Sequence, residues 1–344
     1  MSIMYNEILE QPGVLAGIEE VNREVLSDLI ARIKQRDIKL VVIAARGTSD
    51  HCGIYMQYLT GVLLGIPVLL AAPSLNTLYG TKILYKDALV IAISQSGMAQ
   101  DALAVLEDAN RCGAITAAVT NTPDSPIGKT AQYCLYCAAG AEKSVAATKT
   151  FTAEMFCLAL LASEWAQNNE LRQALYALPG GITKEIGKAE DIMNIAREYT
   201  FMQQCIVLGR GLLYPIALEA ALKMMETSYI NARGFSVSDF QHGPLALVGD
   251  KMPMFVLCSS DEAREGVLRA AKEYAALGAY VTIITDDMKN TKSAQNLFIT
   301  EKSCKYTAPF HFAVFAQLFA CGLAAAKRCT PDTPRNIKKI TVTK

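Results

Sequence analysis

The segment Ala88-Leu-Val-Ile-Ala-Ile-Ser-Gln-Ser-Gly97 indicates a strand that ends in a polar turn. Residues 88–93 are all apolar, which predicts a buried parallel strand, and residues 99–109 have helical spacing. Because the first backbone N–H groups of a helix have no partner inside it, the turn at 94–97 can bind a small anion such as phosphate. A Ser/Gly turn with an N-cap is the alternative, which these four residues alone leave open.

Short apolar strands alternate with amphipathic helices through both halves of the chain. The predicted strands are 39–45, 67–71, 88–94, 115–120 and 133–137, followed by 204–208, 253–258, 280–285 and 296–300. Predicted helices cover 14–36 and 148–167 in the first half. The alternation is typical of an α/β fold, and it predicts a doubly wound parallel sheet flanked by helices, of the flavodoxin-like kind, in each half.

The second half repeats the first. Strand 39–45 leads into Arg46-Gly-Thr-Ser49, strand 205–208 leads into Gly209-Arg-Gly211, and segment 113–120 matches segment 278–285 at an offset of 164 to 165 residues. A constant offset predicts a true duplication. The expected domains are 1–167 with an N-terminal helix, a helical linker at 168–199, a second domain at 200–330, and a C-terminal tail at 331–344, which the resemblance given below implies to cover the active site.

Two hydroxyl-rich turns fall at the same edge of the first predicted sheet. In doubly wound sheets ligands bind beyond the carboxyl ends of the strands. The turns at 46–49 and 94–97 both follow such ends, so their convergence favours phosphate binding over a plain turn.

The composition restricts the class of protein. The chain has 344 residues, is 51% hydrophobic and balances 33 basic with 33 acidic residues, which argues against nucleic acid or an anionic membrane as the main partner. Apolar runs are expected to be too short to span a bilayer, and the N-terminus does not resemble a signal peptide, so a cytoplasmic protein with ten reduced cysteines is expected. Three histidines without ligand spacing give no sign of a metal site.

One helix and two later residues are candidates for proton transfer. Glu219, Lys223 and Glu226 are spaced four and three residues apart, so they share one face of a helix whose other residues are mostly apolar. A buried lysine beside carboxylates suits proton transfer, whereas a surface salt-bridge ladder is the alternative. His242 lies in a Gly-Pro turn and Lys339 in a basic tail, and for each a structural or solvated role is the alternative.

Taken together, these segments resemble the sugar isomerase (SIS) family, specifically the isomerase half of glutamine:fructose-6-phosphate amidotransferase. The matching motifs span nearly the whole chain. They are Gly47-Thr-Ser49, Ser94-Gln-Ser-Gly97, Val145-Ala-Ala-Thr-Lys-Thr-Phe151, Leu208-Gly-Arg-Gly211, Tyr214-Pro-Ile-Ala-Leu-Glu219, Glu226-Thr-Ser-Tyr229, His242-Gly-Pro-Leu-Ala-Leu247 and Pro334-Arg-Asn336. The resemblance implies two tandem SIS domains, a homodimer and no cofactor.

The resemblance also implies a role for each candidate residue. Thr48, Ser94, Gln95 and Ser96, with Ser49 beside them, are expected to hold the phosphate of a hexose 6-phosphate, and Val145 and Ala147 to contact the sugar. Glu226 is expected to move the proton between C1 and C2, with Lys223 and Glu219 in the same site. His242 is expected to assist ring opening from the neighbouring subunit, and Lys339 to form an imine with the open-chain ketose.

Departures from the family pattern bear on the substrate. The chain begins Met1-Ser-Ile3 rather than with a glutaminase domain and its N-terminal cysteine, so a glutamine-dependent reaction is not expected. Met98 and Ala99 replace an acid and a threonine, and Ala147 replaces a serine. The expected activity is that of the SIS-type glucosamine-6-phosphate deaminases, with a fructosamine-6-phosphate deglycase, an aldose–ketose isomerase and a non-catalytic phosphosugar sensor as alternatives.

Overall fold

A computed structural model describes residues 2–249 and 251–339, which form two compact units that are discontinuous in sequence. Unit 1 contains the residues up to Leu9, Lys143–Thr148 and Gly180–Asn336. Unit 2 contains Glu10–Glu142, Lys149–Pro179 and the chain from Ile337 onward. The domain boundaries expected from the sequence are continuous segments and stay a prediction.

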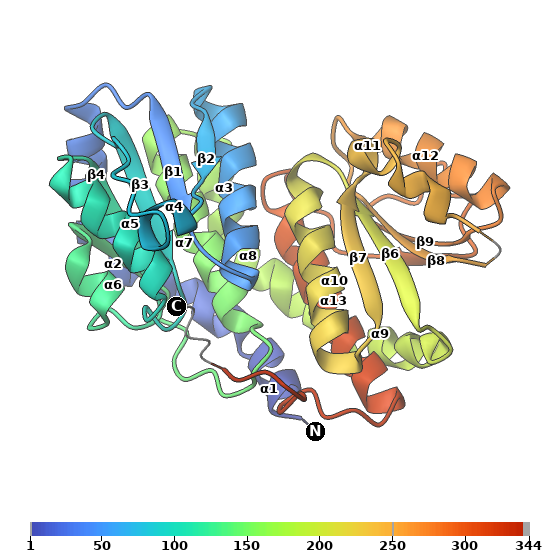
Figure 1. Cartoon of the computed structure of the whole chain (residues 1–344). Helices are drawn as coiled ribbons and strands as arrows, with labels where there is room; N and C mark the ends of the chain where they lie inside the picture. Colours follow the sequence, from blue (N-terminus) through green and yellow to red (C-terminus); the bar gives the residue numbers. More distant parts are fainter. Residues whose placement is uncertain (1, 250, 340–344) are drawn as a thin grey trace. The chain divides into compact units, whose positions relative to one another are not determined.

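Unit 2 is built on a five-stranded parallel sheet in the order β2-β1-β3-β4-β5 (Figure 1). Its strands are β1 (Leu40–Ala44), β2 (Val68–Leu70), β3 (Ala88–Ile93), β4 (Ile115–Thr120) and β5 (Tyr133–Tyr136). Helices α4 (Ser74–Thr77), α5 (Gln100–Arg111) and α6 (Pro126–Thr130) cover one face; α2 (Gln11–Lys34), α3 (Thr48–Leu64) and α7 (Lys149–Ala166) cover the other. Helices on both faces bury the central strands, which explains why all six residues of β3 are apolar and buried.

Unit 1 repeats this topology with a sheet in the order β10-β9-β8-β6-β7. Its strands are β6 (Gln204–Gly209), β7 (Asn231–Ser236), β8 (Pro253–Cys258), β9 (Tyr280–Thr285) and β10 (Asn296–Ile299). The long helices are α10 (Tyr214–Ser228), α12 (Arg264–Ala276) and α13 (Ala308–Ala326). The shorter ones are α1 (Ile3–Leu9), α9 (Ala189–Ala196), η1 (Arg197–Tyr199), η2 (Gly211–Leu213), α11 (Val237–Phe240) and η3 (Pro244–Leu247), and α8 (Asn169–Ile186) contains the boundary between the units. The prediction of two doubly wound parallel sheets is confirmed.

Strand β7 is the strand that the sequence analysis missed. Its residues, Asn-Ala-Arg-Gly-Phe-Ser, are partly polar because it is an edge strand that pairs only with β6. Gly234 lets helix α10 approach, since a Cβ there would lie 2.7 Å from the Ala217 carbonyl oxygen. Strand β7 therefore occupies in unit 1 the place of β2 in unit 2.

Helix α13 has the length and apolar composition of a membrane span, contrary to the expectation that no run in the chain is long enough. It has 19 residues, and 94% of its most apolar window is buried inside the structure. It packs against α9 and α10, and Phe315 and Phe319 stack within its own face. This burial is typical of a core helix.

Candidate active site

The turn at 94–97 in unit 2 is fixed by main-chain hydrogen bonds. Gly97 N donates to Ser94 O at 3.1 Å, and Asn121 N donates to Gln95 O at 3.0 Å. Gly97 has a φ of +64°, and a Cβ at this position would lie 1.8 Å from Ser125 Oγ. Only glycine therefore fits, and the conformation of the turn is set by its surroundings.

The side chains of this turn remain available to a ligand. Ser94 is buried, and Gln95 and Ser96 are half-buried. Ser96 Oγ accepts the Met98 N–H at 3.3 Å. Within the described part of the chain, no hydrogen bond involves the Ser94 hydroxyl or the Gln95 amide. A phosphate at the turn can bond to these groups without breaking an existing contact.

The neighbouring turn brings Thr48 and Ser49 to the start of α3, where they have different surroundings. Thr48 is half-buried at the first helical position. Ser49 is buried, and its hydroxyl donates to Glu154 Oε1 on α7 at 3.0 Å. Cys52 donates to the other oxygen of the same carboxylate at 3.5 Å. Ser49 thus bonds into the core of unit 2.

The equivalent turn of unit 1, after β8, has its hydroxyls bonded to acids. Ser259 Oγ donates to Asp261 at 2.8 Å, and Ser260 Oγ donates to Asp286 at 2.9 Å. Two carboxylates at a turn repel an anion. The duplication therefore retains a phosphate-compatible turn in unit 2 and an acidic one in unit 1.

Helix α10 carries the predicted charged cluster, which lies in the interior of unit 1. Lys223 Nζ lies 3.2 Å from Glu219 Oε1 and 2.7 Å from Glu226 Oε2. The side chains of Lys223 and Glu219 are fully buried, whereas that of Glu226 is 21% exposed. Burial opposes the charged form of Lys223, but the two carboxylates favour it more strongly and keep its pKa above the ordinary value. Lys223 is thus a fixed cation, and of the two carboxylates Glu226 is the one that solvent or a ligand can reach.

The loop that contains Val145 and Ala147 is bonded within unit 1 to the segment around Asp332. Val145 N donates to Asp332 O at 3.2 Å, and the side chains of Val145 and Ala147 are half-buried. The Asp332 carboxylate accepts the N–H groups of Ile3 and Met4 at 2.9 and 2.8 Å. Asp332 therefore joins this loop to helix α1.

His242 is exposed, in the segment between α11 and η3. Its N–H donates to Asp239 O at 3.0 Å, and Gly243 follows with a φ of +130°. An exposed imidazole on a turn is accessible to a second chain.

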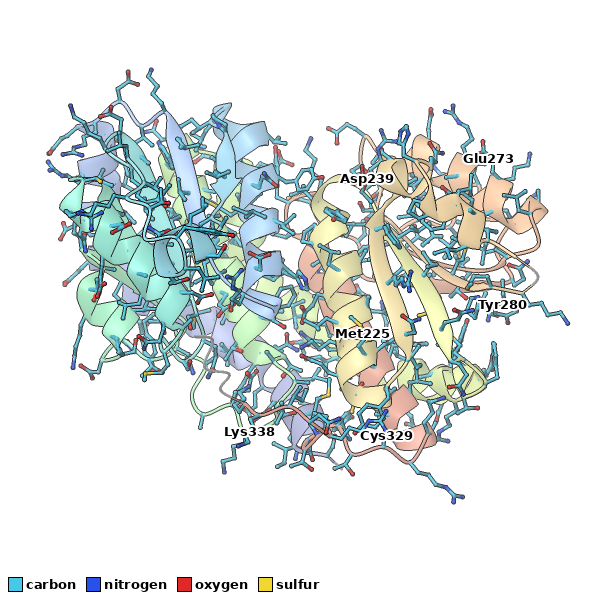
Figure 2. The ribbon with its side chains drawn as sticks, viewed as in Figure 1. Met225, Asp239, Glu273, Tyr280, Cys329 and Lys338 are labelled. Atoms are coloured by element: carbon cyan, nitrogen blue, oxygen red, sulfur yellow. The ribbon has the colours of Figure 1, made fainter. Side chains whose placement is uncertain are left out.

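The tail lysine Lys339 is bound to a buried carboxylate in unit 2. Its Nζ lies 2.5 Å from Glu142 Oε2, and the Glu142 side chain is fully buried. Glu142 also accepts the Thr150 hydroxyl at 2.7 Å and the Thr150 N–H at 3.2 Å. Lys338 is exposed, and Figure 2 shows its side chain extending outward from the tail. Lys339 is therefore ion-paired, and not simply solvated as a basic tail would be.

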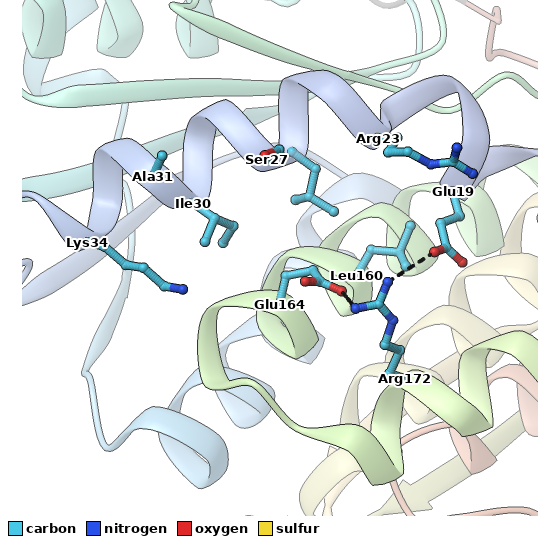
Figure 3. Close-up of a pocket in the computed structure, with 10 residues that line it drawn as sticks. Glu19, Arg23, Ser27, Ile30, Ala31, Lys34, Leu160, Glu164 and Arg172 are labelled. Carbon is cyan, nitrogen blue, oxygen red and sulfur yellow. Dashed lines mark ion pairs between the residues drawn. The ribbon is translucent and has the colours of Figure 1, made fainter.

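A groove of about 420 Å³ lies elsewhere in unit 2, along α2, α7 and α8 (Figure 3). Arg172 crosses it to Glu164 at 2.6 Å and to Glu19 at 3.5 Å. None of the residues that line it is a predicted site residue.

Comparison with known proteins identifies the family. The model of the SIS domain matches residues 34–164 and 202–327. The chain belongs to the SIS domain family. The two SIS matches correspond to the two sheets, which confirms the resemblance inferred from the motifs.

Curated relatives of this SIS protein are longer than the chain. It is 35% identical to glutamine–fructose-6-phosphate aminotransferase (isomerizing) of Halobacterium salinarum and 34% identical to that of Aquifex aeolicus, over 98% of the chain in both cases. The chain spans only 58% and 57% of the length of these two relatives.

Solved structures share the fold. The C-terminal domain of glucosamine-fructose-6-phosphate aminotransferase from Francisella tularensis superposes with a TM-score of 0.87 at 25% identity, covering 97% of this chain and 98% of that one. Glucosamine-6-phosphate deaminase from Thermotoga maritima gives a TM-score of 0.75 at 20% identity, covering 99% and 100%. The second similarity supports the fold alone.

Proposed function

We propose that this SIS protein converts glucosamine 6-phosphate, or a related amino sugar 6-phosphate, to fructose 6-phosphate and ammonia. The relatives and the motifs support a phosphosugar substrate. The observation that favours catalysis over simple binding is the ion pair between Lys339 and the buried Glu142. A protein that only senses a phosphosugar does not need this ion pair. A sensor requires only the phosphate-binding turns.

Binding of the phosphate and of the sugar falls to separate candidate residues in the proposed reaction. Thr48, Ser94, Gln95 and Ser96 bind the phosphate, and Val145 and Ala147 contact the sugar. Ser49 supports the turn through Glu154.

The reaction begins when His242 assists opening of the sugar ring. Glu226 then takes the proton from C2 and returns it to C1, while a proton passes from the C2 nitrogen to O1, and the aldose amine becomes a ketose imine. The buried cation Lys223 stabilises the negative charge on Glu226. Glu142 accepts a proton from the Lys339 ammonium, and the free amine adds to C2 of the imine. The C2–N bond to the original amine breaks as Glu142 returns the proton, and ammonia leaves. Water then adds to the lysine imine, the bond between C2 and Lys339 Nζ breaks, and fructose 6-phosphate leaves with Lys339 again an ammonium.

The proposed assembly is a cytoplasmic homodimer in which His242 acts on the partner's substrate. The exposure of His242 in the single chain supports this. Mixing His242→Ala with Glu226→Gln subunits is expected to restore about a quarter of wild-type activity, because half the dimers are mixed and each has one intact site. A mixture as inactive as its parts contradicts the sharing.

The test of the function is product analysis on a panel of substrates. The pure protein is incubated with glucosamine 6-phosphate, fructosamine 6-phosphates and unsubstituted hexose 6-phosphates, and ammonia, amine and ketose are quantified. Ammonia from glucosamine 6-phosphate supports the deaminase. Amine release from a fructosamine 6-phosphate, or aldose–ketose conversion alone, selects the deglycase or the isomerase, and binding without turnover selects the sensor.

A further inference from the structure

Arg46 and Ser94 follow neighbouring strands at the same level of the unit 2 sheet. Strands β1 and β3 pair in parallel with Ala44 opposite Ala92, and Arg46 and Ser94 each come two residues later. Adjacent strands are about 4.8 Å apart, so the two turns begin side by side. Arg46 is the one lysine or arginine in the sequences Arg46-Gly-Thr-Ser49 and Ser94-Gln-Ser-Gly97.

The Arg46 guanidinium is held at one nitrogen. Its Nε lies 2.6 Å from Asp101 Oδ2, in the first turn of α5 that follows the turn at 94–97. Asp101 is buried with a side-chain exposure of 7%, whereas Arg46 is 53% exposed. Within the described residues, neither Nη nitrogen of Arg46 makes a hydrogen bond. Asp101 Oδ1 accepts the N–H of Ala102 at 2.9 Å, so the start of α5 fixes the buried carboxylate while its other oxygen holds Arg46.

We propose that Arg46 is a phosphate ligand of the site, oriented by Asp101; the inference rests on the proposed function. A guanidinium fixed through Nε presents its two Nη groups, the geometry that binds two phosphate oxygens. The hydroxyls and amide of the two turns are neutral, so Arg46 brings the one positive charge in the two turns, and the Asp101 carboxylate offsets part of it. Its donors also take the place of the hydroxyl that is missing at Ala99.

The test compares two arginine–aspartate pairs at opposite ends of α5. Arg111 pairs with Asp108 at 2.5 Å and is 47% exposed, which makes Arg111→Gln a matched control for Arg46→Gln. Inorganic phosphate and fructose 6-phosphate are titrated calorimetrically into each protein at low and high salt. Arg46→Gln is expected to weaken binding of both by about 10- to 100-fold, the size of a charge-assisted hydrogen bond. Arg111→Gln is expected to bind both like the wild type.

The Asp101→Asn variant tests whether Arg46 binds phosphate or only connects the two turns. The amide oxygen still accepts the Nε–H, but the competing negative charge is gone, so phosphate binding is expected to stay equal or to tighten. Equal loss of binding and of melting temperature in Arg46→Gln and Asp101→Asn would mean that the pair only ties the turns together.

Two further results also overturn the inference, and they are distinguishable from each other. Phosphate binding by Arg46→Gln within twofold of the wild type removes Arg46 and leaves the proposed function intact. A wild-type protein that binds neither probe removes the phosphate turns themselves, and the proposed function fails with them.

Discussion

Lys339 Nζ lies 2.5 Å from Oε2 of Glu142, a carboxylate with no exposed surface that is 197 residues earlier in the chain. The Thr150 hydroxyl and N–H bond to the same carboxylate. The two donors of Thr150 hold Glu142, and Glu142 in turn pairs with the tail lysine. The exposed neighbour Lys338 provides a control within the same tail.

Lys339→Ala is expected to abolish turnover, whereas Lys338→Ala is expected to be nearly silent, because the proposed mechanism uses Lys339, and not the exposed Lys338, as the amine that adds to C2. Borohydride added with fructose 6-phosphate should trap a covalent adduct at Lys339 in the wild type and in Lys338→Ala. Peptide mass spectrometry of the reduced protein locates the adduct. Glu142→Gln should lower the yield of adduct, since the amide cannot form the ion pair. Equal and mild effects at both lysines would favour the sensor.

Glu226→Gln is expected to retain sugar-phosphate binding and to lose about 10²-fold or more in kcat, the usual contribution of a positioned acid or base. The amide keeps the size of the side chain and a contact with Lys223 but cannot accept the C2 proton. Steady-state kinetics and exchange of the C2 hydrogen with solvent deuterium measure the effect. Near-normal exchange would remove Glu226 from the mechanism.

Replacing Ser94 and Ser96 together with alanine is expected to raise KM with little change in kcat, because the phosphate is held alike in the ground state and the transition state. Ser260→Ala is the matched control, since this serine lies at the equivalent turn of unit 1 and bonds to Asp286. Steady-state kinetics with the substrate that the product analysis identifies will show whether KM or kcat changes. A fall in kcat at constant KM would contradict the assignment of the turn.

Lys223→Met is expected to destabilise the protein by ~3–5 kcal/mol, because it leaves the buried Glu219 without its cation. The pKa of Lys223 is raised, so its stabilising contribution is complete below the ordinary lysine pKa and is lost only as pH rises through the higher folded value. The free energy of unfolding, measured with urea, should therefore be lower than that of the wild type by a constant amount between about pH 7 and 9. Glu219→Gln combined with Lys223→Met should recover part of the loss; a difference that disappears by pH 9 would contradict the charged pair.

The fold could be predicted well because its central strands are apolar runs bounded by turn residues. Strands β3 and β4 coincide closely with the predicted segments, as buried parallel strands do. Strand β7 could not be found this way, since an edge strand has no need of a continuous apolar run.

The local structure of the candidate site could be predicted where its residues are close in sequence, as at the turn 94–97 and on helix α10, whereas the roles of these residues stay predictions. Glu142 was missed because it lies in a loop without periodicity and its partner Lys339 is far along the chain. Thr48 and Ser49 were grouped together, but consecutive helical residues point in different directions, and Ser49 bonds to Glu154.

The hydrogen bonds that the Asp332 carboxylate accepts from the N–H groups of Ile3 and Met4 have a consequence for biosynthesis. Ribosomes extend a chain at about 5–20 residues per second, and domains begin to fold as they emerge. The sheet of unit 2 uses strands from the first part of the chain, so it can assemble early. Unit 1 must wait, because Asp332 follows Ile3 by 329 residues. Helix α1 therefore lacks this contact until Asp332 has been synthesised, and nascent chains that end before Asp332 cannot complete unit 1.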